Sequence, residues 1–279
     1  LGALLMTLMP LHLILSIDIV TASVAVLPLL FIGIPQPDRS HELAHPDAAP
    51  PSMLADMRAG LRYVRHWPGL LMILVLAMIL NFVISPAFSL MPILVTKHFG
   101  GGALQLGTLQ SAWAIGIVVG GLVLGAWGGF KKRAITSMLG IVGMGIGILG
   151  IAAAPSNLFG LAVAGMLFGG FMNPMANGPL FAMLQTIVAP EMQGRVMSLV
   201  GSGSAAMMPL SLLVAGPIAD LVGVRVWYVA AGITCVFMGL LALNIPAIMN
   251  AEHNGQHKPQ TVPVAVQDAT EAVAPATLE

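Results

Sequence analysis

The fold of this chain is decided by the stretch PGLLMILVLAMILNFVISPAFSLMPILV, residues 68–95, which contains no charged side chain. Apolar runs of similar length follow it as far as Met249. An α-helix needs about 20 residues to cross roughly 30 Å of hydrocarbon, and these runs reach that length. A helix on the surface of a soluble protein would show a polar face every 3.6 residues, and these runs do not. The pattern predicts an all-α, polytopic membrane protein.

The charged residues of this region lie in or beside the short joints between the apolar runs. Of the 279 residues of the chain, 8% are charged and 57% are hydrophobic, and the mean hydropathy is +0.93. A typical soluble domain has about 25% charged residues. From Pro68 to Met249 the charged residues are Lys97, Lys131, Lys132, Arg133, Glu191, Arg195, Asp220 and Arg225.

The composition also argues against several classes of function. The formal net charge is zero, so no basic surface predicts nucleic-acid binding. The sequence contains no phosphate-binding loop that would predict direct use of ATP. Neither a pair of acids nor a cluster of histidines lies within the spans. We therefore expect no enzymatic activity, no metal site and no cofactor.

Seven spans are predicted from the apolar runs and from the Gly and Pro residues at their ends. They cover about residues 13–34, 69–95, 106–128, 134–153, 158–188, 197–221 and 226–249. Leu1–Met9 resembles the end of a further helix, with a turn at Pro10–His12.

The segment between the first two spans differs from the rest. A Pro/His/Asp-rich stretch up to Pro51 predicts a flexible linker, and Ser52 can cap a helix after it. That helix has an apolar stripe and a cationic stripe, formed by Leu54, Met57, Leu61 and Val64 and by Arg58, Arg62 and Arg65. It either lies in the membrane interface with its arginines toward anionic headgroups or is a solvated helix on a cytoplasmic loop.

The distribution of Lys and Arg predicts the orientation. If the linker lies on side one and the spans alternate, side two receives only Lys97 and Arg225. Side one receives Arg39, Arg58, Arg62, Arg65, Lys131, Lys132, Arg133, Arg195 and Lys258. Since positive residues are enriched in cytoplasmic loops, side one is predicted to be cytoplasmic. The polar residues 250–279 then form a disordered cytoplasmic tail.

Two stretches resemble each other, GLVLGAWGGFKKR at residues 121–133 and GPIADLVGVR at residues 216–225. Both follow G-x-x-x-[D/G]-x-x-G-x-[basic], and they lie three spans apart. Internal repeats of three spans are typical of many secondary transporters.

At these residues the chain resembles the major facilitator superfamily, whose signature between paired helices is roughly G-x-L-A-D-R-x-G-R-R. The match is weaker at residues 121–133, where Gly125 stands in the place of the acid. The segments LRYVRHWP, APEMQGRVMS and GPLFAMLQ, which begin at residues 61, 189 and 178, further resemble the macrolide-efflux and siderophore-export branch of bacterial drug:proton antiporters.

The resemblance implies a major facilitator-type helical bundle in the bacterial inner membrane, with the sixth to twelfth of twelve helices present and the N-terminal helices missing. Residues 1–34 would end the N-terminal half, residues 35–68 would be the cytoplasmic linker with its amphipathic helix, and residues 69–249 would form the C-terminal six-helix half.

The resemblance also suggests a gate made of charged residues and glycines at the helix ends. The basic cluster at 131–133 can equally be a simple topology signal. The gating candidates are Gly121, Gly128, Lys131, Lys132, Arg133, Glu191, Arg195, Gly216, Asp220, Gly223 and Arg225.

Asp18 is the only acid placed well inside an apolar run. A carboxylate in hydrocarbon is costly unless it is paired, hydrated or protonated, which makes Asp18 a candidate for proton coupling. Its place about two turns from Pro10–His12 also allows a structural or interfacial role.

Neutral polar and aromatic groups inside the spans are candidates for lining a substrate site. The segment at residues 173–179, with two prolines, predicts an interruption of the helix that faces a cavity. The alternative for each amide is a hydrogen bond to a neighbouring helix. The candidates are Asn81, Phe82, Gln110, Trp113, Asn173, Asn177 and Gln185.

Glycines at four-residue spacing predict close helix contacts. The pairs are Gly116/Gly120, Gly121/Gly125 and Gly165/Gly169, and a glycine run extends from Gly140 to Gly150.

Two functions remain open from the sequence. The first is a secondary transporter that exports hydrophobic or amphipathic small molecules, macrolide-like drugs or siderophores, in exchange for protons by alternating access. The second is a membrane protein without transport activity, either an assembly or scaffold partner or an inactive half-transporter. Kinked helices with central polar groups favour the first.

Overall fold

The computed structural model describes residues 10–27 and 53–250, and within them it contains helices and no strands. The all-α prediction is therefore confirmed. The helices are α2 (Leu11–Val26), α3 (Met53–Arg65), α4 (Pro68–Ser89), α5 (Met91–Ile93), the π-helix η2 (Leu94–His98), α6 (Ala103–Trp127), α7 (Arg133–Ala153), α8 (Phe159–Ile187), α9 (Pro190–Val222), α10 (Val224–Leu243) and α11 (Pro246–Met249).

Six of these helices are long and apolar enough to cross a membrane, namely α4, α6, α7, α8, α9 and α10. They correspond to six of the seven predicted spans, and the chain is a multi-pass helical membrane protein. The first predicted span, at about 13–34, overlaps α2 and continues outside the described residues. The predicted turn at Pro10–His12 is shorter than expected, because α2 already begins at Leu11 behind Pro10.

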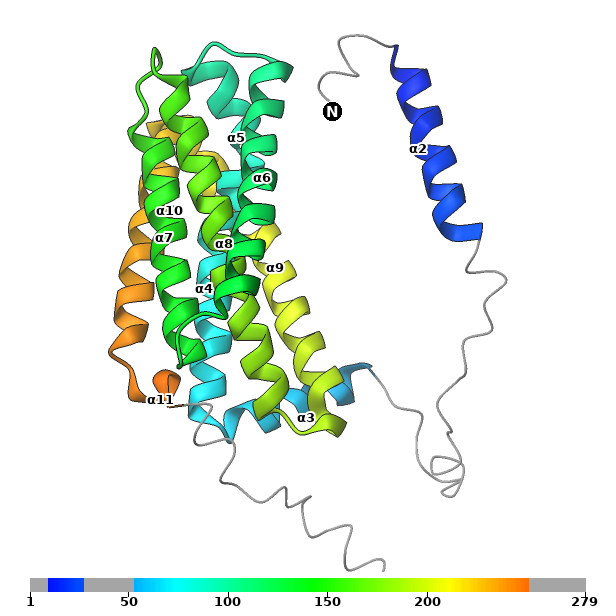
Figure 1. Ribbon diagram of the computed structural model, residues 1–279, viewed down its shortest axis with the longest axis vertical. Helices are drawn as coiled ribbons and strands as arrows, with labels where there is room; N and C mark the ends of the chain where they lie inside the picture. Colours follow the sequence, from blue (N-terminus) through cyan, green and yellow to red (C-terminus); the bar gives the residue numbers. More distant parts are fainter. Residues whose placement is uncertain (1–9, 28–52, 251–279) are drawn as a thin grey trace, which may run out of the picture.

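The six long helices stand side by side in one bundle, and Figure 1 shows α2 apart from it. α7 packs against α8 and α10, α8 also packs against α6, and α4 packs mainly against α9. α3 lies across one end of the bundle, where it contacts α9 and α4 (Figure 1).

Glycines bring the backbones of neighbouring helices together. A Cβ atom on Gly140 of α7 would lie 2.4 Å from the backbone nitrogen of Ala176 in α8, and one on Gly120 of α6 would lie 2.1 Å from the carbonyl oxygen of Phe171. Such contacts are possible only without a side chain. Gly121 and Gly125 make no such contact among the described residues, since a Cβ on either would meet no described atom within 4 Å, and their packing role stays a prediction.

The second span is divided, where one continuous run was expected. α4 ends at Ser89, and the helix resumes at Met91 with Pro92 in its first turn. Pro92 has no N–H to donate to the carbonyl of Phe88, so the α-helical ladder cannot continue through this position. The chain then passes into η2, which ends at His98.

α9 begins earlier than predicted, at Pro190 instead of about residue 197. Proline is well suited to the first position of a helix, and the charged residues that follow extend the helix beyond its apolar part. At the other end, only Gly223 separates α9 from α10.

The described cations divide between the two ends of the bundle as the alternation of spans requires. The end that carries α3 and α11 (Figure 1) also holds the α6–α7 and α8–α9 joints and has Arg58, Arg62, Arg65, Lys131, Lys132, Arg133 and Arg195. The opposite end has Lys97 and Arg225.

Candidate functional site

A cavity of about 80 Å³ lies between α4, α8 and α9, close to α3. Its polar lining residues are Asn81 of α4, Asn177 of α8 and Ser204 of α9. The remaining lining residues are apolar: Val64, Leu70, Ile73, Leu74, Ala77, Leu180, Phe181, Leu184, Val196 and Val200. The structure thus brings together two of the predicted lining residues, Asn81 and Asn177.

Both amides are fixed by their own helices. Asn81 Nδ2 donates to the carbonyl of Ala77 at 2.9 Å, and Asn177 Nδ2 donates to the carbonyl of Asn173 at 3.1 Å. A carbonyl only accepts, so the amide nitrogen must face it. Among the described residues neither amide oxygen has a hydrogen-bond partner, which leaves both oxygens able to accept from a ligand.

Ser204 was not predicted to line a site. Its signal in the sequence was a polar run, Gly201–Ser204, inside an otherwise apolar span. Serine in a membrane helix can bond to its own backbone, so the run alone does not say which way its hydroxyls face. In the structure Ser204 is half-buried and lines the cavity, which settles the direction for this one serine of the run.

Asn173 contacts a different neighbour. Its Nδ2 lies 4.0 Å from the sulfur of Met144 in α7. The interruption expected at residues 173–179 was wrong, because α8 is a continuous helix with Pro174 and Pro179 inside it. Each proline removes a single N–H, and a packed membrane helix tolerates that loss.

The other predicted lining residues lie outside the cavity. Trp113 of α6 packs its ring edge-on against Phe88, with centroids 4.8 Å apart, and Phe82 is half-buried against the core. Gln110 and Gln185 are exposed.

Two side chains of α10 hold the distorted part of α4. Trp227 Nε1 donates to the carbonyl of Val83 at 3.0 Å, in the turn before Pro86. The buried hydroxyl of Tyr228 donates to the carbonyl of Ala87. That carbonyl is among the last four of α4 and has no partner within its own helix. α10 therefore stabilises the end of α4 beside the break at Leu90.

The first copy of the repeated motif forms the α6–α7 joint. Gly128 has a φ of 79° and ends α6 in the left-handed conformation that glycine favours. Arg133 Nη1 donates to the hydroxyl of Thr186 at 3.1 Å, in the last turn of α8. Lys131 and Lys132 are exposed, and so is Gly121.

The second copy forms the α9–α10 joint. Gly223, with a φ of 95°, follows Asp220 in the last turn of α9, while Gly216 is half-buried two turns earlier. Arg225 donates from Nη2 and Nε to the carbonyl of Ala152, at 2.7 and 3.0 Å. Its guanidinium therefore stabilises the C-terminal end of α7, where a positive charge is favourable.

The candidates on the first turns of α9 are only partly described. The side chain of Glu191 lies outside the described residues, as does that of Asp18 in α2. Arg195 Nη1 donates to the sulfur of Met192 at 3.7 Å. A Cβ atom on Gly60 would lie 3.3 Å from the carbonyl oxygen of Arg195, so α3 packs directly on this part of α9.

Comparison with known proteins points to a single superfamily of membrane transporters. The family model of the Major Facilitator Superfamily matches residues 70–272. Macrolide efflux protein A of Streptococcus pyogenes is 29% identical over 238 residues, 84% of this chain and 57% of the relative. Its counterpart in Enterococcus faecalis is 30% identical over 76% of this chain and 64% of the relative. Multidrug efflux pump Tap of Mycolicibacterium fortuitum is 27% identical over 71% of this chain and 47% of the relative.

The chain therefore spans about half to two thirds of the length of these relatives. No solved structure matches it. The family match covers well over half of the chain and includes all six long helices of the bundle, apart from the first residues of α4. The chain belongs to the Major Facilitator Superfamily.

Proposed function

We propose that this chain is the substrate-binding part of a secondary transporter that exports hydrophobic or amphipathic small molecules in exchange for protons. The observation that carries the proposal is the cavity between α4, α8 and α9, with Asn81, Asn177 and Ser204 in an apolar wall. Sites for small organic ligands combine an apolar lining with a few fixed polar groups. The names of the relatives, macrolide efflux protein A and multidrug efflux pump Tap, support efflux of drugs.

The cavity is small for such a ligand. Its volume of about 80 Å³ compares with roughly 300–1,000 Å³ for typical ligand sites. We infer that it is one wall of a larger site, which N-terminal helices complete and which widens when α4 and α9 separate. This motion is the alternating access that the proposal requires. The clamp of Trp227 and Tyr228 on α4 leaves the break at Leu90 as a place where α4 and η2 can move relative to each other.

The proposal assigns proton coupling to Asp18, because a carboxyl group within an apolar run can exchange its charge for a proton. It places residues 35–68 and the tail 250–279 in the cytoplasm of a bacterium, with residues 69–249 as the C-terminal six-helix half in the inner membrane. The basic end of the bundle supports this orientation. The charged residues at the α6–α7 and α9–α10 joints, which lie at opposite ends of the bundle, form a gate at each end.

The test is export from an efflux-deficient bacterium that expresses the protein from its complete reading frame. Accumulation of a fluorescent lipophilic cation and of a macrolide is followed with and without a protonophore. The proposal predicts export that the protonophore abolishes. The Asn81→Ala/Asn177→Ala variant should change the ratio of the two export rates several-fold, whereas Gln110→Ala, an exposed amide outside the cavity, should not. Equal effects of both variants would contradict the assignment of the cavity.

A membrane assembly protein without transport activity is the second candidate. It stays open because the face of α9 with Leu213 and Leu221, which are 75% and 86% exposed, can contact another protein as well as lipid. If neither compound is exported while the protein is verified in the membrane, this candidate replaces the first.

A further inference from the structure

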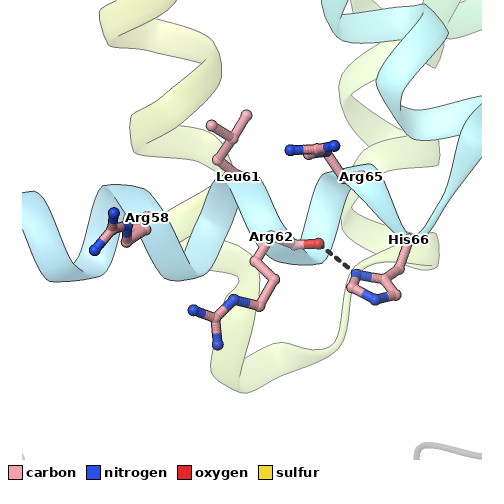
Figure 2. A pocket seen from close by; sticks show the side chains of 5 residues that line it. All are labelled: Arg58, Leu61, Arg62, Arg65 and His66. Carbon is pink, nitrogen blue, oxygen red and sulfur yellow. Dashed lines mark hydrogen bonds between the residues drawn. The ribbon is translucent and has the colours of Figure 1, made fainter.

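The exposed face of α3 carries three arginines in one row. Arg58, Leu61, Arg62 and Arg65 are spaced i, i+3, i+4 and i+7, which places them on one side of a helix. Together with His66 they line a recess of about 530 Å³ (Figure 2). We call this the cationic recess. Its volume lies within the roughly 300–1,000 Å³ range of small-molecule sites.

The opposite face of α3 is packed, so the helix cannot turn its arginines inward. Val64 is 1% exposed, and Gly60 lies against the backbone of Arg195 in α9. The hydroxyl of Tyr63 accepts a hydrogen bond from the N–H of Ala189 at 3.3 Å. This arrangement corrects the apolar stripe expected from the sequence, because Leu61 is 44% exposed on the arginine side.

The recess lies at the depth where a membrane has its headgroups. α3 packs beside the first turns of α9, and only two residues separate it from the start of α4 at Pro68. Both helices are membrane-spanning, so their first turns lie at the boundary between hydrocarbon and water. An exposed leucine between arginines is typical of a helix in this interface, with its apolar side chain toward the acyl chains.

The chemistry of the recess fits a phosphate group. Guanidinium groups bind phosphate oxygens through paired N–H donors. Among the described residues no ion pair engages Arg58, Arg62 or Arg65. His66 Nδ1 lies 2.7 Å from the carbonyl oxygen of Arg62 (Figure 2), and since a carbonyl only accepts, Nδ1 is the donor. This bond fixes the imidazole at the edge of the recess.

We propose that the cationic recess binds the phosphodiester of an anionic phospholipid, such as phosphatidylglycerol, and so holds α3 and the start of α9 at the membrane surface. The proposal is independent of the transport activity, because it concerns a different face of the molecule from the cavity between α4, α8 and α9.

The experiment measures lipid binding by native mass spectrometry. The purified full chain is titrated with phosphatidylglycerol or with phosphatidylcholine, which has the same phosphodiester but no net charge. Three variants are compared with the parent: Arg62→Gln/Arg65→Gln, the conservative Arg58→Lys/Arg62→Lys/Arg65→Lys, and Lys131→Gln/Lys132→Gln. The last is the matched control, since it removes two exposed charges from the same end of the bundle.

The parent should prefer phosphatidylglycerol. Removing Arg62 and Arg65 should weaken that binding by about fivefold for each arginine. The control variant should retain it within about twofold. The lysine variant should bind with intermediate affinity, because lysine keeps the charge and loses the paired donors.

Three outcomes would overturn the proposal. Equal binding of the two lipids by the parent excludes an anionic-lipid site, even if a variant fails to fold. Equal losses in the two glutamine variants would show a general charge effect of this end of the bundle. Displacement of the lipid by millimolar inorganic phosphate would show that the recess binds a soluble anion instead.

Discussion

The helices α7 and α9 are similarly apolar, but α7 is mostly buried within the bundle and α9 is mostly exposed at its surface. In the most apolar part of α7, 67% of the residues are buried, whereas in that of α9 only 11% are. α7 lies between α8 and α10, and its glycines meet the backbones of both: a Cβ on Gly147 would lie 2.7 Å from the carbonyl of Gly165, and one on Gly145 would lie 2.8 Å from the nitrogen of Val236.

The glycines of α9 have no such neighbours, since a Cβ on Gly201 or Gly216 would meet no described atom within 4 Å. Hydrophobicity therefore determines that a helix enters the membrane, and the fit of small residues against a neighbouring backbone determines which helices pack. α7 is the structural centre of this bundle, while α9 offers one face to the cavity and another for contact with lipid or protein.

The largest effect should come from adding a side chain to a tightly packed glycine. Gly140→Val places its Cβ against the backbone nitrogen of Ala176 and should destabilise the bundle by about 3 kcal/mol or more. Gly216→Val in α9 should change the stability by less than about 0.5 kcal/mol. The thermal midpoint of the detergent-solubilised protein, followed by size-exclusion chromatography, measures both. Similar losses in the two variants would remove the contrast between the helices.

A smaller difference is expected at the helix ends. Arg225→Met removes the two hydrogen bonds to the carbonyl of Ala152 at the end of α7 and should cost about 1 kcal/mol. Asp220→Asn in the last turn of α9 removes a negative charge from the unfavourable end of a helix dipole. It should leave stability unchanged or raise it by about 0.3 kcal/mol. If Asp220→Asn were the more damaging change in the same melting assay, the two residues would act as an ion pair.

Two serines, one in each of these helices, should give small effects of different kinds. Ser137 of α7 is fully buried, and its hydroxyl has no hydrogen-bond partner among the described residues. Ser137→Ala should therefore stabilise the protein by about 0.5–1 kcal/mol. Ser204→Ala should leave the melting temperature unchanged and alter the ratio of exported compounds, because Ser204 lines the cavity. A loss of stability in Ser137→Ala would mean that its hydroxyl has a partner.

The spans could be predicted from the sequence because apolar length is a local property. The ends were less accurate: charges near residues 191–195 concealed the first turns of α9, and the break at Leu90 was not expected, although Pro92 lies directly after it. In both places the misleading residues, charged ones in the first case and a proline in the second, differ from the apolar residues of the helix they join.

The candidate site was predicted only in part. Asn81 and Asn177 line the cavity, while Gln110 and Gln185 are exposed, although all four are amides inside apolar runs. A helix that is apolar all round carries no sequence signal for its rotation, which is set by packing. The same limitation explains why Ser204 was missed. α3 is amphipathic, and there the prediction for Leu61 was wrong because Leu61 lies at the border between the apolar and the cationic stripe, one turn from both Arg58 and Arg65.

The single residue between α9 and α10 has a consequence for how the protein is made. One residue spans at most about 3.5 Å. Gly223 alone joins the two helices, so there is no loop long enough to let one helix enter the membrane independently of the other. We therefore expect the two helices to enter the membrane together, as one helical hairpin. An epitope tag or protease site placed at Gly223 would interfere with biogenesis itself, whereas the same insertion at residues 128–132, between α6 and α7, enters an exposed joint.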